Sequence, residues 1–157
     1  MSRKLTLPIQ QDQSVPALEV QGFLAILQAA DHLERGLNET LRMSSLSGHQ
    51  YNVLRILRSA GEGGLPCQEI GHRMITRAPD ITRLLDRLEV RRLVARHRPS
   101  TDRRVVTTCI TPAGLKSLAK LDAPVRALHA RQLSHLGDSR LRSLVANLDM
   151  LQQRSGT

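Results

Sequence analysis

The chain has 157 residues, an ordinary length for one domain that folds without a disulfide or a structural metal. It carries 23 Lys and Arg against 14 Asp and Glu, a formal net charge of +9, and the basic residues are nearly all arginine. The arginine side chain presents a planar set of donors that suits phosphates and guanine edges. This composition therefore favours a nucleic-acid partner first and an anionic membrane surface second.

Several classes of protein are excluded by composition. No apolar run approaches the roughly 20 residues that span a bilayer, and residues 1–16 lack the apolar core of a signal peptide. Two cysteines, Cys67 and Cys109, are too few for a secreted disulfide scaffold. We therefore expect a protein of the reducing cytoplasm that has no membrane partner.

The positive charge is concentrated in one segment. Ten arginines and four acidic residues lie between Arg73 and Arg104, a net charge of +6 in a fifth of the chain. A charge run on a single helix is most often a solvated surface. This run extends over a predicted helix and the hairpin after it, so we interpret it as a binding surface for a polyanion.

The first half of the chain is predicted to be helical after a short arm. Residues 1–16 contain prolines and several glutamines and are expected to form a flexible arm. Residues 17–42 carry apolar side chains at spacings of three and four, which is typical of a long amphipathic helix. Ser47 and Gln50 form a capping box that starts a second helix, and the glycines of residues 61–64 end it.

Two shorter helices follow. The third is expected over Cys67–Met74, and the fourth from a cap at Thr76 to about Arg92, with Pro79 tolerated in its first turn. In the fourth helix, apolar residues at positions i, i+3, i+4 and i+7 form one buried stripe: Ile81, Leu84, Leu85 and Leu88. That stripe turns five other side chains outward: Pro79, Thr82, Arg83, Asp86 and Arg87.

After the fourth helix the period of the apolar pattern changes. Val94–Arg98 and Val105–Ile110 are β-branched or alternating segments, and residues 99–102, which lie between them, have turn chemistry. We therefore predict a basic β-hairpin. Thr111–Pro112 then caps a fifth helix, and a sixth amphipathic helix begins near Asp138.

Three helices followed by a basic hairpin are the layout of a winged helix-turn-helix, in which the last helix enters the major groove. The predicted fold class is mainly α with a small β-hairpin wing (α+β). Two arginines one turn apart on the exposed face of the fourth helix suit bases or phosphates. The alternative is an ordinary surface helix on which Arg83 and Arg87 pair with acidic neighbours.

The segment ITRLLDRLEVRRLVARHRPSTDRRVVTTCITPAG, residues 81–114, resembles the signature of the MarR family of bacterial transcription regulators. The TRLLDRLE helix, the DRR turn and the strand ending in Thr-Pro-x-Gly carry the resemblance. It extends more loosely to YNVLRIL in the second helix and to the helices at both ends of the chain.

The resemblance implies a homodimer that binds a palindromic operator, with residues 17–157 as one regulator domain. Residues 47–110 would form the DNA-binding lobe, and helices over residues 17–42 and 111–154 would form the dimer base. The apolar stripes of the terminal helices agree with a dimer, because a single small lobe cannot cover them. The resemblance also implies a repressor in the bacterial cytoplasm, associated with the nucleoid when bound.

The same resemblance assigns DNA contacts by position. The segment from Arg77 to Arg83 would lie in the major groove, Arg87 would touch the backbone, Asp102 would brace the turn, and Arg103 or Arg104 would reach the minor groove. A pairing of Arg104 within the hairpin is the alternative. The full set of candidate DNA-binding residues is Arg77, Ala78, Pro79, Asp80, Thr82, Arg83, Arg87, Arg98, Ser100, Thr101, Asp102, Arg103 and Arg104.

Two positions depart from the family's usual pattern. Pro79 and Asp80 stand where small hydroxyl residues are common, so base preference is not carried over from relatives. Asp80 either accepts a hydrogen bond from cytosine N4 or stabilises the partial positive charge at the N-terminus of the fourth helix. The second interpretation is favoured.

Regulation is indicated more weakly. Family members often bind a small aromatic or phenolic anion between the dimer base and the winged lobe. Here an aromatic ligand would have to stack on Phe23 or Tyr51, with its carboxylate near His32, Arg35 or Arg55, although each of these residues also has an ordinary surface or packing role. Cys67 begins a helix, where a thiol pKa can be lowered, but packing alone explains it as well.

Other functional classes have little support in the sequence. No phosphate loop, nucleophile motif or metal-ligand spacing is present, so neither catalysis nor a cofactor is expected. Two alternatives to a sequence-specific regulator stay open. One is a non-specific architectural DNA-binding protein, and the other is a winged helix used only to bind other proteins.

Overall fold

The computed structural model describes residues 17–76, 80–97 and 105–153. Its helices and strands follow in the order α1 (Leu18–Leu41), η1 (Arg42–Ser44), α2 (Gly48–Ala60), η2 (Gly61–Gly63), β1 (Leu65–Pro66), α3 (Cys67–Arg73), α4 (Ile81–Val90), β2 (Val94–His97), β3 (Thr107–Ile110), α5 (Pro112–Leu133), η3 (Ser134–Leu136) and α6 (Gly137–Gln153). This mainly helical chain with a small antiparallel sheet confirms the predicted fold class. The predicted arm, residues 1–16, lies outside the described residues.

The chain divides into two compact units, with the boundary between His32 and Leu33, inside α1. The first unit, as far as it is described, is the N-terminal part of α1. Most of its large apolar side chains are exposed, among them Leu18, Phe23 and Leu27. The second unit contains the remaining elements and the hydrophobic core.

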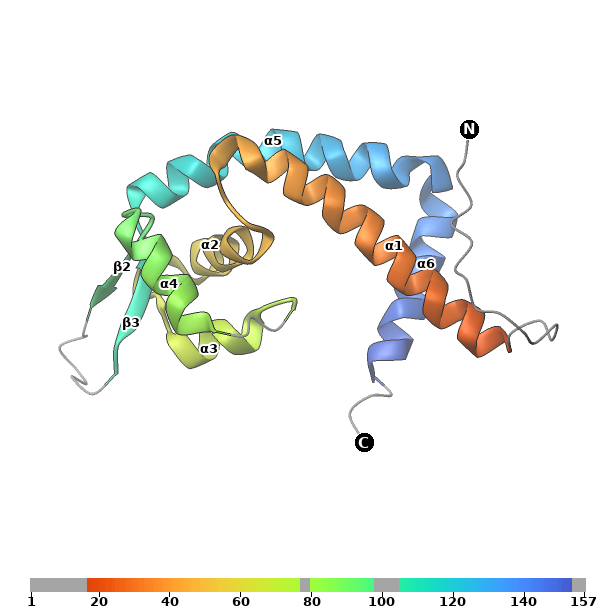
Figure 1. Cartoon of the computed structure of the whole chain (residues 1–157), viewed down its shortest axis with the longest axis horizontal. Helices are drawn as coiled ribbons and strands as arrows, with labels where there is room; N and C mark the ends of the chain where they lie inside the picture. The colour runs from red at the N-terminus through yellow and green to blue at the C-terminus, as the bar shows by residue number, and fades with distance from the viewer. Residues whose placement is uncertain (1–16, 77–79, 98–104, 154–157) are drawn as a thin grey trace, which may run out of the picture. The chain divides into compact units, whose positions relative to one another are not determined.

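The core of the second unit lies where α2, α3, α4 and α5 meet the sheet. Its most buried side chains come from all of these elements: Val53, Leu54, Leu57, Ile70, Leu85, Leu88, Val94, Leu118 and Leu121. Figure 1 shows α3 and α4 lying beside the β2–β3 hairpin, and α4 packs directly against β2. The predicted stripe of α4 therefore faces this core, with Leu85 and Leu88 fully buried and Ile81 and Leu84 half-buried.

The capping predictions for α2 and α5 are confirmed. The Ser47 side chain accepts a hydrogen bond from the Gln50 N–H at 3.2 Å, and the Gln50 side chain accepts one from the Ser47 N–H at 3.1 Å. The Thr111 hydroxyl accepts from the Gly114 N–H at 3.1 Å, with Pro112 at the first helical position. Both helices begin where their local sequence predicts.

The predicted start of the fourth helix is wrong. Thr76 does not cap it, because α4 begins at Ile81 with Asp80 as its N-cap, whose carboxylate accepts a hydrogen bond from the Arg83 N–H at 3.0 Å. The helix also ends at Val90 rather than Arg92. Pro79, expected in the first turn, precedes the helix and lies outside the described residues.

The wing has a third strand that the sequence did not reveal. β1 pairs antiparallel with β3 through Leu65 opposite Thr108 and Pro66 opposite Thr107, so the sheet order is β1-β3-β2. Gly64 introduces this strand with φ of +61°, and a Cβ there would collide with the Thr108 carbonyl. The pairing of β2 with β3 confirms the hairpin, although β3 begins at Thr107 rather than Val105.

Candidate nucleic-acid interface

The outer face of α4 presents polar and charged side chains to solvent. Thr82, Arg83, Asp86 and Arg87 are all exposed, as the apolar stripe on the opposite face predicts. The side chain of Arg83 is 78% exposed, and its Nε lies 3.4 Å from Asp80 Oδ2. An ion pair this exposed contributes little to stability, so Arg83 is available to another anion.

Arg87 lies one turn after Arg83 on the same face. Within the described part of the chain, the structure gives it no ion pair. The alternative interpretation, in which both arginines pair with acidic neighbours, therefore describes Arg83, which pairs with Asp80, but not Arg87. Both guanidinium groups are exposed on this face, although only Arg83 has an acidic partner among the described residues.

Asp80 occupies the position where α4 begins. Its carboxylate caps the helix through Arg83 N–H and also lies near the Arg83 side chain. The favoured interpretation, that the Asp80 carboxylate interacts with the N-terminus of the helix, is confirmed.

The C-terminal end of α4 is held to the turn that follows α1. Arg91 Nη1 donates to the Ser45 carbonyl at 2.7 Å, and Arg91 Nη2 donates to the Ser44 carbonyl at 3.0 Å. The next residue, Arg92, has φ of +55°, and its carbonyl accepts a hydrogen bond from the Thr111 hydroxyl at 2.7 Å. These bonds fix the end of α4 on the lobe.

Arg96 connects the hairpin with α4. Its guanidinium lies 2.6 Å from Asp86 Oδ1 and 3.1 Å from Glu89 Oε2. Sequence reasoning counted Arg96 only as part of the positive charge. Asp86 and Glu89 lie in α4 and Arg96 lies in β2, and no local pattern indicates that the arginine meets the two carboxylates.

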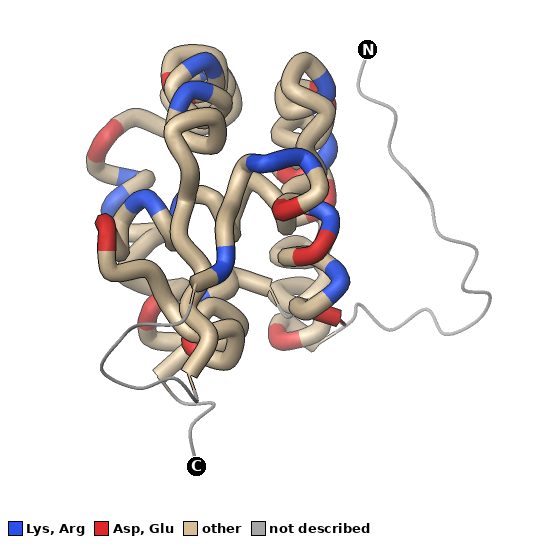
Figure 2. Tube along the Cα trace, turned by 90° about the vertical axis from the view of Figure 1, so that its left-hand side faces the viewer, with Lys and Arg blue, Asp and Glu red and all other residues tan. Residues whose placement is uncertain are grey.

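Basic residues dominate the described segment around this interface. Between Asp80 and His97 there are five arginines and three acidic residues. Figure 2 shows how the basic and acidic positions are distributed along the trace. Two of the five arginines, Arg91 and Arg96, bind within the protein, so the charge available to a ligand is smaller than the sequence count suggests.

Nine of the thirteen predicted DNA-binding residues are not described. Asp80, Thr82, Arg83 and Arg87 are the four whose positions are given above. The others lie in residues 77–79 and 98–104, outside the described residues: Arg77, Ala78, Pro79, Arg98, Ser100, Thr101, Asp102, Arg103 and Arg104.

The five predicted ligand-binding residues belong to both units. Phe23 and His32 lie on the first unit, where Phe23 is 61% exposed. In the second unit Tyr51 is buried, and the Arg55 guanidinium lies 5.8 Å from the centre of its ring. Arg55 therefore covers one face of the Tyr51 ring, and Arg35 is exposed on α1.

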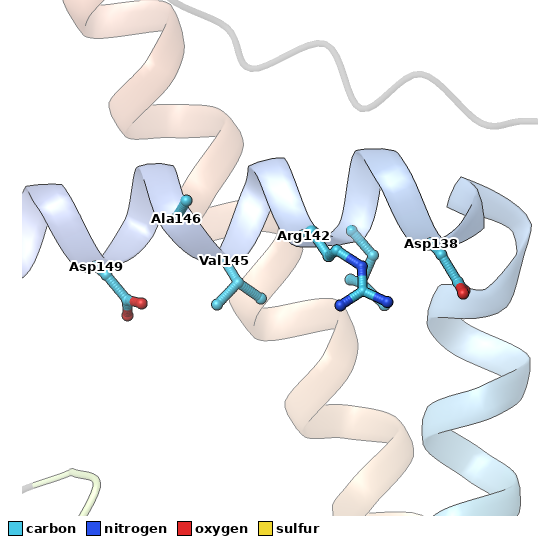
Figure 3. Close-up of a pocket in the computed structure, with 6 residues that line it drawn as sticks. Asp138, Arg142, Val145, Ala146 and Asp149 are labelled. Carbon is cyan, nitrogen blue, oxygen red and sulfur yellow. The ribbon is translucent and has the colours of Figure 1, made fainter.

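Of the hollows on the second unit, two lie along α2 and along α6. One, of about 270 Å³, is bordered by α2, the end of α3 and the residues after it, and includes Arg55 and Arg73. The other is an open hollow of about 460 Å³ along α6. Figure 3 shows Arg142 and Val145 of this hollow on one side of α6, between Asp138 and Asp149.

Neither cysteine forms a disulfide. Cys67 Sγ lies 4.0 Å from Thr82 Oγ1, next to the exposed face of α4. The Cys109 thiol donates to the Glu62 carbonyl at 3.2 Å, and burial raises its pKa. In the described ranges, no group of His, Cys, Asp and Glu is arranged to hold a metal ion, and no helix is long and apolar enough to cross a membrane.

Comparison with known proteins places these features in a family. Residues 46–106 match the model of the MarR family. The regulator TtmR of Methylorubrum extorquens (strain PA1) is 31% identical over 143 residues, which cover 90% of this chain and 72% of the relative. A MarR transcription factor from Planctomyces limnophilus has a solved structure that is 39% identical, with a TM-score of 0.66, and the match covers 87% of this chain and 99% of that one.

Other relatives match over a shorter segment. The repressor MdtR of Bacillus subtilis (strain 168) is 31% identical over 103 residues, or 66% of this chain and 65% of the relative. The matches to MhqR of the same organism and FarR of Neisseria gonorrhoeae cover 63% and 62% of those proteins. The chain thus spans a little under two thirds of these three relatives.

Solved structures below 25% identity also share the fold, including the following two. One is S. aureus MepR in complex with DNA, with a TM-score of 0.73 and 17% identity, matched over 90% of this chain and 99% of that one. The other is Rhodococcus jostii CouR bound to p-coumaroyl-CoA, with a TM-score of 0.74 and 23% identity, matched over 87% of this chain and 95% of that one.

Proposed function

This chain belongs to the MarR family of transcriptional regulators, and we propose that it binds a specific sequence of double-stranded DNA through α4 and the hairpin that follows. The observation that carries the proposal is the exposed face of α4. There, Arg83 and Arg87 stand one turn apart on a helix whose opposite face is locked into the core. A rigid helix with exposed guanidinium groups suits the major groove, in which arginine reads guanine O6 and N7.

In this proposal, Thr82 and Arg83 contact base edges or phosphates, and Arg87 contacts the DNA backbone. The segments outside the described residues take the roles that the resemblance implies. Residues 77–79 approach the major groove, and residues 98–104 carry the tip of the wing toward the minor groove. Residues 47–110 form the DNA-binding lobe, residues 17–42 and 111–154 supply the dimer helices, and residues 1–16 form an arm.

A homodimer on a palindromic operator is the second part of the proposal. It is supported by apolar side chains that stay exposed on each unit. Phe23 and Leu27 are exposed on the first unit, and Val145 and Leu151 on α6 of the second. Soluble proteins rarely leave such rows of apolar side chains uncovered, and a two-fold dimer covers one such surface with its copy.

We further propose that the protein is a repressor of the bacterial cytoplasm, released from DNA by a small aromatic anion. MdtR, a relative, is named as a repressor, and CouR, which shares the fold, was solved with p-coumaroyl-CoA bound. In this chain Phe23, His32, Arg35, Tyr51 and Arg55 are the candidate ligand-binding residues. Because Arg55 covers the Tyr51 ring, binding at that position would require the guanidinium to move.

The experiment that tests this proposal is selection of bound fragments from a random DNA pool by the full chain. The selected duplex and a shuffled control are then compared by fluorescence anisotropy over a salt series. We expect a palindrome with half-sites about one helical turn apart, steep salt dependence and a large ratio between the two affinities.

Two other outcomes would overturn the proposal in different ways. Salt-dependent binding without an enriched sequence would identify an architectural DNA-binding protein. Absence of binding to any duplex, with and without candidate aromatic anions, would favour a winged helix that binds other proteins.

A further inference from the structure

The Arg96 side chain is directed at α4 rather than into solvent. Its Nη1 donates to Asp86 Oδ1 at 2.6 Å and to Glu89 Oε2 at 3.1 Å, and its Nη2 lies 3.4 Å from the Thr82 carbonyl. The Arg96 side chain is 26% exposed, in contrast to 78% for Arg83. Arg96 is therefore the arginine of this surface that is most fully engaged within the protein.

The backbone of Arg96 takes part in the same connection. β2 is an edge strand of the sheet, and the Arg96 N–H donates to Glu89 Oε1 at 3.2 Å. An edge strand leaves alternate N–H groups without a partner in the sheet. The Glu89 carboxylate thus binds both the backbone N–H and the guanidinium of Arg96.

Asp86 and Glu89 are three residues apart, which places them on adjacent turns of one side of α4. The two carboxylates hold Arg96 from the helix, and the pairing of β2 with β3 carries that constraint to the whole hairpin. This cluster ties the hairpin to the outer side of α4, in addition to the packing of α4 against β2. Hydrogen bonds between charged groups are stronger than those between neutral groups, and they require a defined geometry. These contacts therefore both attract Arg96 to α4 and orient it.

Asp86 also has an electrostatic consequence for the DNA-facing side of α4. It is exposed on the same face as Thr82, Arg83 and Arg87. An unpaired carboxylate there would repel phosphates, and the contact with Arg96 at 2.6 Å offsets its charge. Arg96 therefore keeps the face positive without itself facing outward.

We propose that Arg96 is a positioning residue that fixes the hairpin relative to α4, so that both reach adjacent grooves of one DNA duplex in register. This inference rests on the proposed DNA-binding function. It assigns to Arg96 an action through Asp86 and Glu89 rather than a contact with phosphate.

The test compares Arg96→Ala with wild type by two footprints on the selected duplex at saturating protein. Protection of guanine N7 from methylation reports the helix in the major groove. Protection of the sugars from hydroxyl radicals reports the hairpin at the minor groove. We expect Arg96→Ala to keep the first footprint and lose the second, with an affinity about tenfold lower, and Arg96→Lys to recover part of the second.

The double variant Asp86→Asn and Glu89→Gln removes the partners of Arg96 while keeping side-chain size. It should give the same split between the footprints, and it keeps the test available if Arg96→Ala does not fold. In this background, Arg96→Ala should cost little further affinity, because the interaction is already lost.

Other results would overturn the inference. If Arg96→Ala lost both footprints together or neither, Arg96 would not position the hairpin. If it lowered the salt slope by about one with no coupling to the carboxylates, Arg96 would be a phosphate contact. A wild-type protein that gives no footprint at all would instead contradict the proposed function, and this inference with it.

Discussion

Gly114 stands where the start of α5 meets the beginning of β2, and its replacement tests the packing of that junction. A Cβ at Gly114 would collide with the Leu93 carbonyl oxygen and lie 2.7 Å from Ile110 Cγ1. Carbon atoms pack at about 3.5–4.0 Å, so Gly114→Ala must displace the neighbouring side chain or backbone by about 1 Å. The Leu93 carbonyl also accepts a hydrogen bond from the Thr111 N–H at 3.1 Å, which the displacement would weaken.

Overpacking a well-packed site costs about 1–3 kcal/mol. The higher helix propensity of alanine offsets at most about 1 kcal/mol of this cost. Relative to a glycine-to-alanine change at an open helical position, which has the same propensity gain, we expect Gly114→Ala to lower the free energy of unfolding by about 1–3 kcal/mol, with the melting temperature lower by about 2–4 °C for each kcal/mol. Urea and thermal unfolding followed by circular dichroism at one fixed protein concentration measure both quantities.

Gly71→Ala is the matched control for this prediction. Gly71 also lies in a helix, α3, but a Cβ there would meet nothing within 4 Å. The control should be stabilised by up to about 1 kcal/mol through helix propensity alone. If Gly114→Ala were as stable as Gly71→Ala, the close approach of α5 to Leu93 and Ile110 would be refuted.

Three further predictions concern α4 and the wing. Leu85→Ala should lower the free energy of unfolding by about 2–5 kcal/mol in urea titrations, because Leu85 is fully buried. Val90→Ala, on the exposed side of α4, should change this free energy by about 0.5 kcal/mol or less. Equal effects of the two substitutions would contradict the burial of Leu85. Asp80→Ala should lower the free energy of unfolding by about 1 kcal/mol, because the helix cap is lost. Asp80→Asn should keep most of this stability, because asparagine also caps helices. Equal losses in the two variants would argue against capping by Asp80. Burial raises the pKa of the Cys109 thiol, so folding disfavours its thiolate. The free energy of unfolding should therefore fall as the pH rises through 9.0, the ordinary pKa of the thiol. If Cys109→Ser and wild type showed the same dependence of this free energy on pH, the prediction would be contradicted.

The features that sequence predicted correctly are those with local causes. The stripe of α4 is visible because Ile81, Leu84, Leu85 and Leu88 repeat at the helical period, and the caps at Ser47 and Thr111 are set by residues within three positions. The start of α4 was placed wrongly because Thr76 and Asp80 are both good capping residues. Nothing in the local sequence ranks one above the other.

The features that sequence missed depend on contacts between elements. β1 is a two-residue strand containing a proline, too short to show a period, and its existence depends on the close approach of Gly64 to β3. Asp86 and Arg96 are ten residues apart in different elements, and their contact exists only because β2 lies beside α4. A count of arginines therefore predicts a basic surface but not which of its arginines are engaged within the protein.

The central claim is that the exposed face of α4 reads DNA sequence, and one measurement tests it most directly. It is the ratio of affinities for the selected and shuffled duplexes, determined for wild type, Arg83→Ala, Arg83→Lys and Arg126→Ala. Arg126→Ala removes the same charge from an exposed position on α5 and serves as the control.

We expect Arg83→Ala to bring the ratio close to one and Arg83→Lys to restore affinity more than discrimination, because lysine lacks the planar fork of donors. Arg126→Ala should keep the wild-type ratio. A wild-type ratio retained by Arg83→Ala, with melting temperatures unchanged throughout, would contradict the role of α4 in sequence recognition.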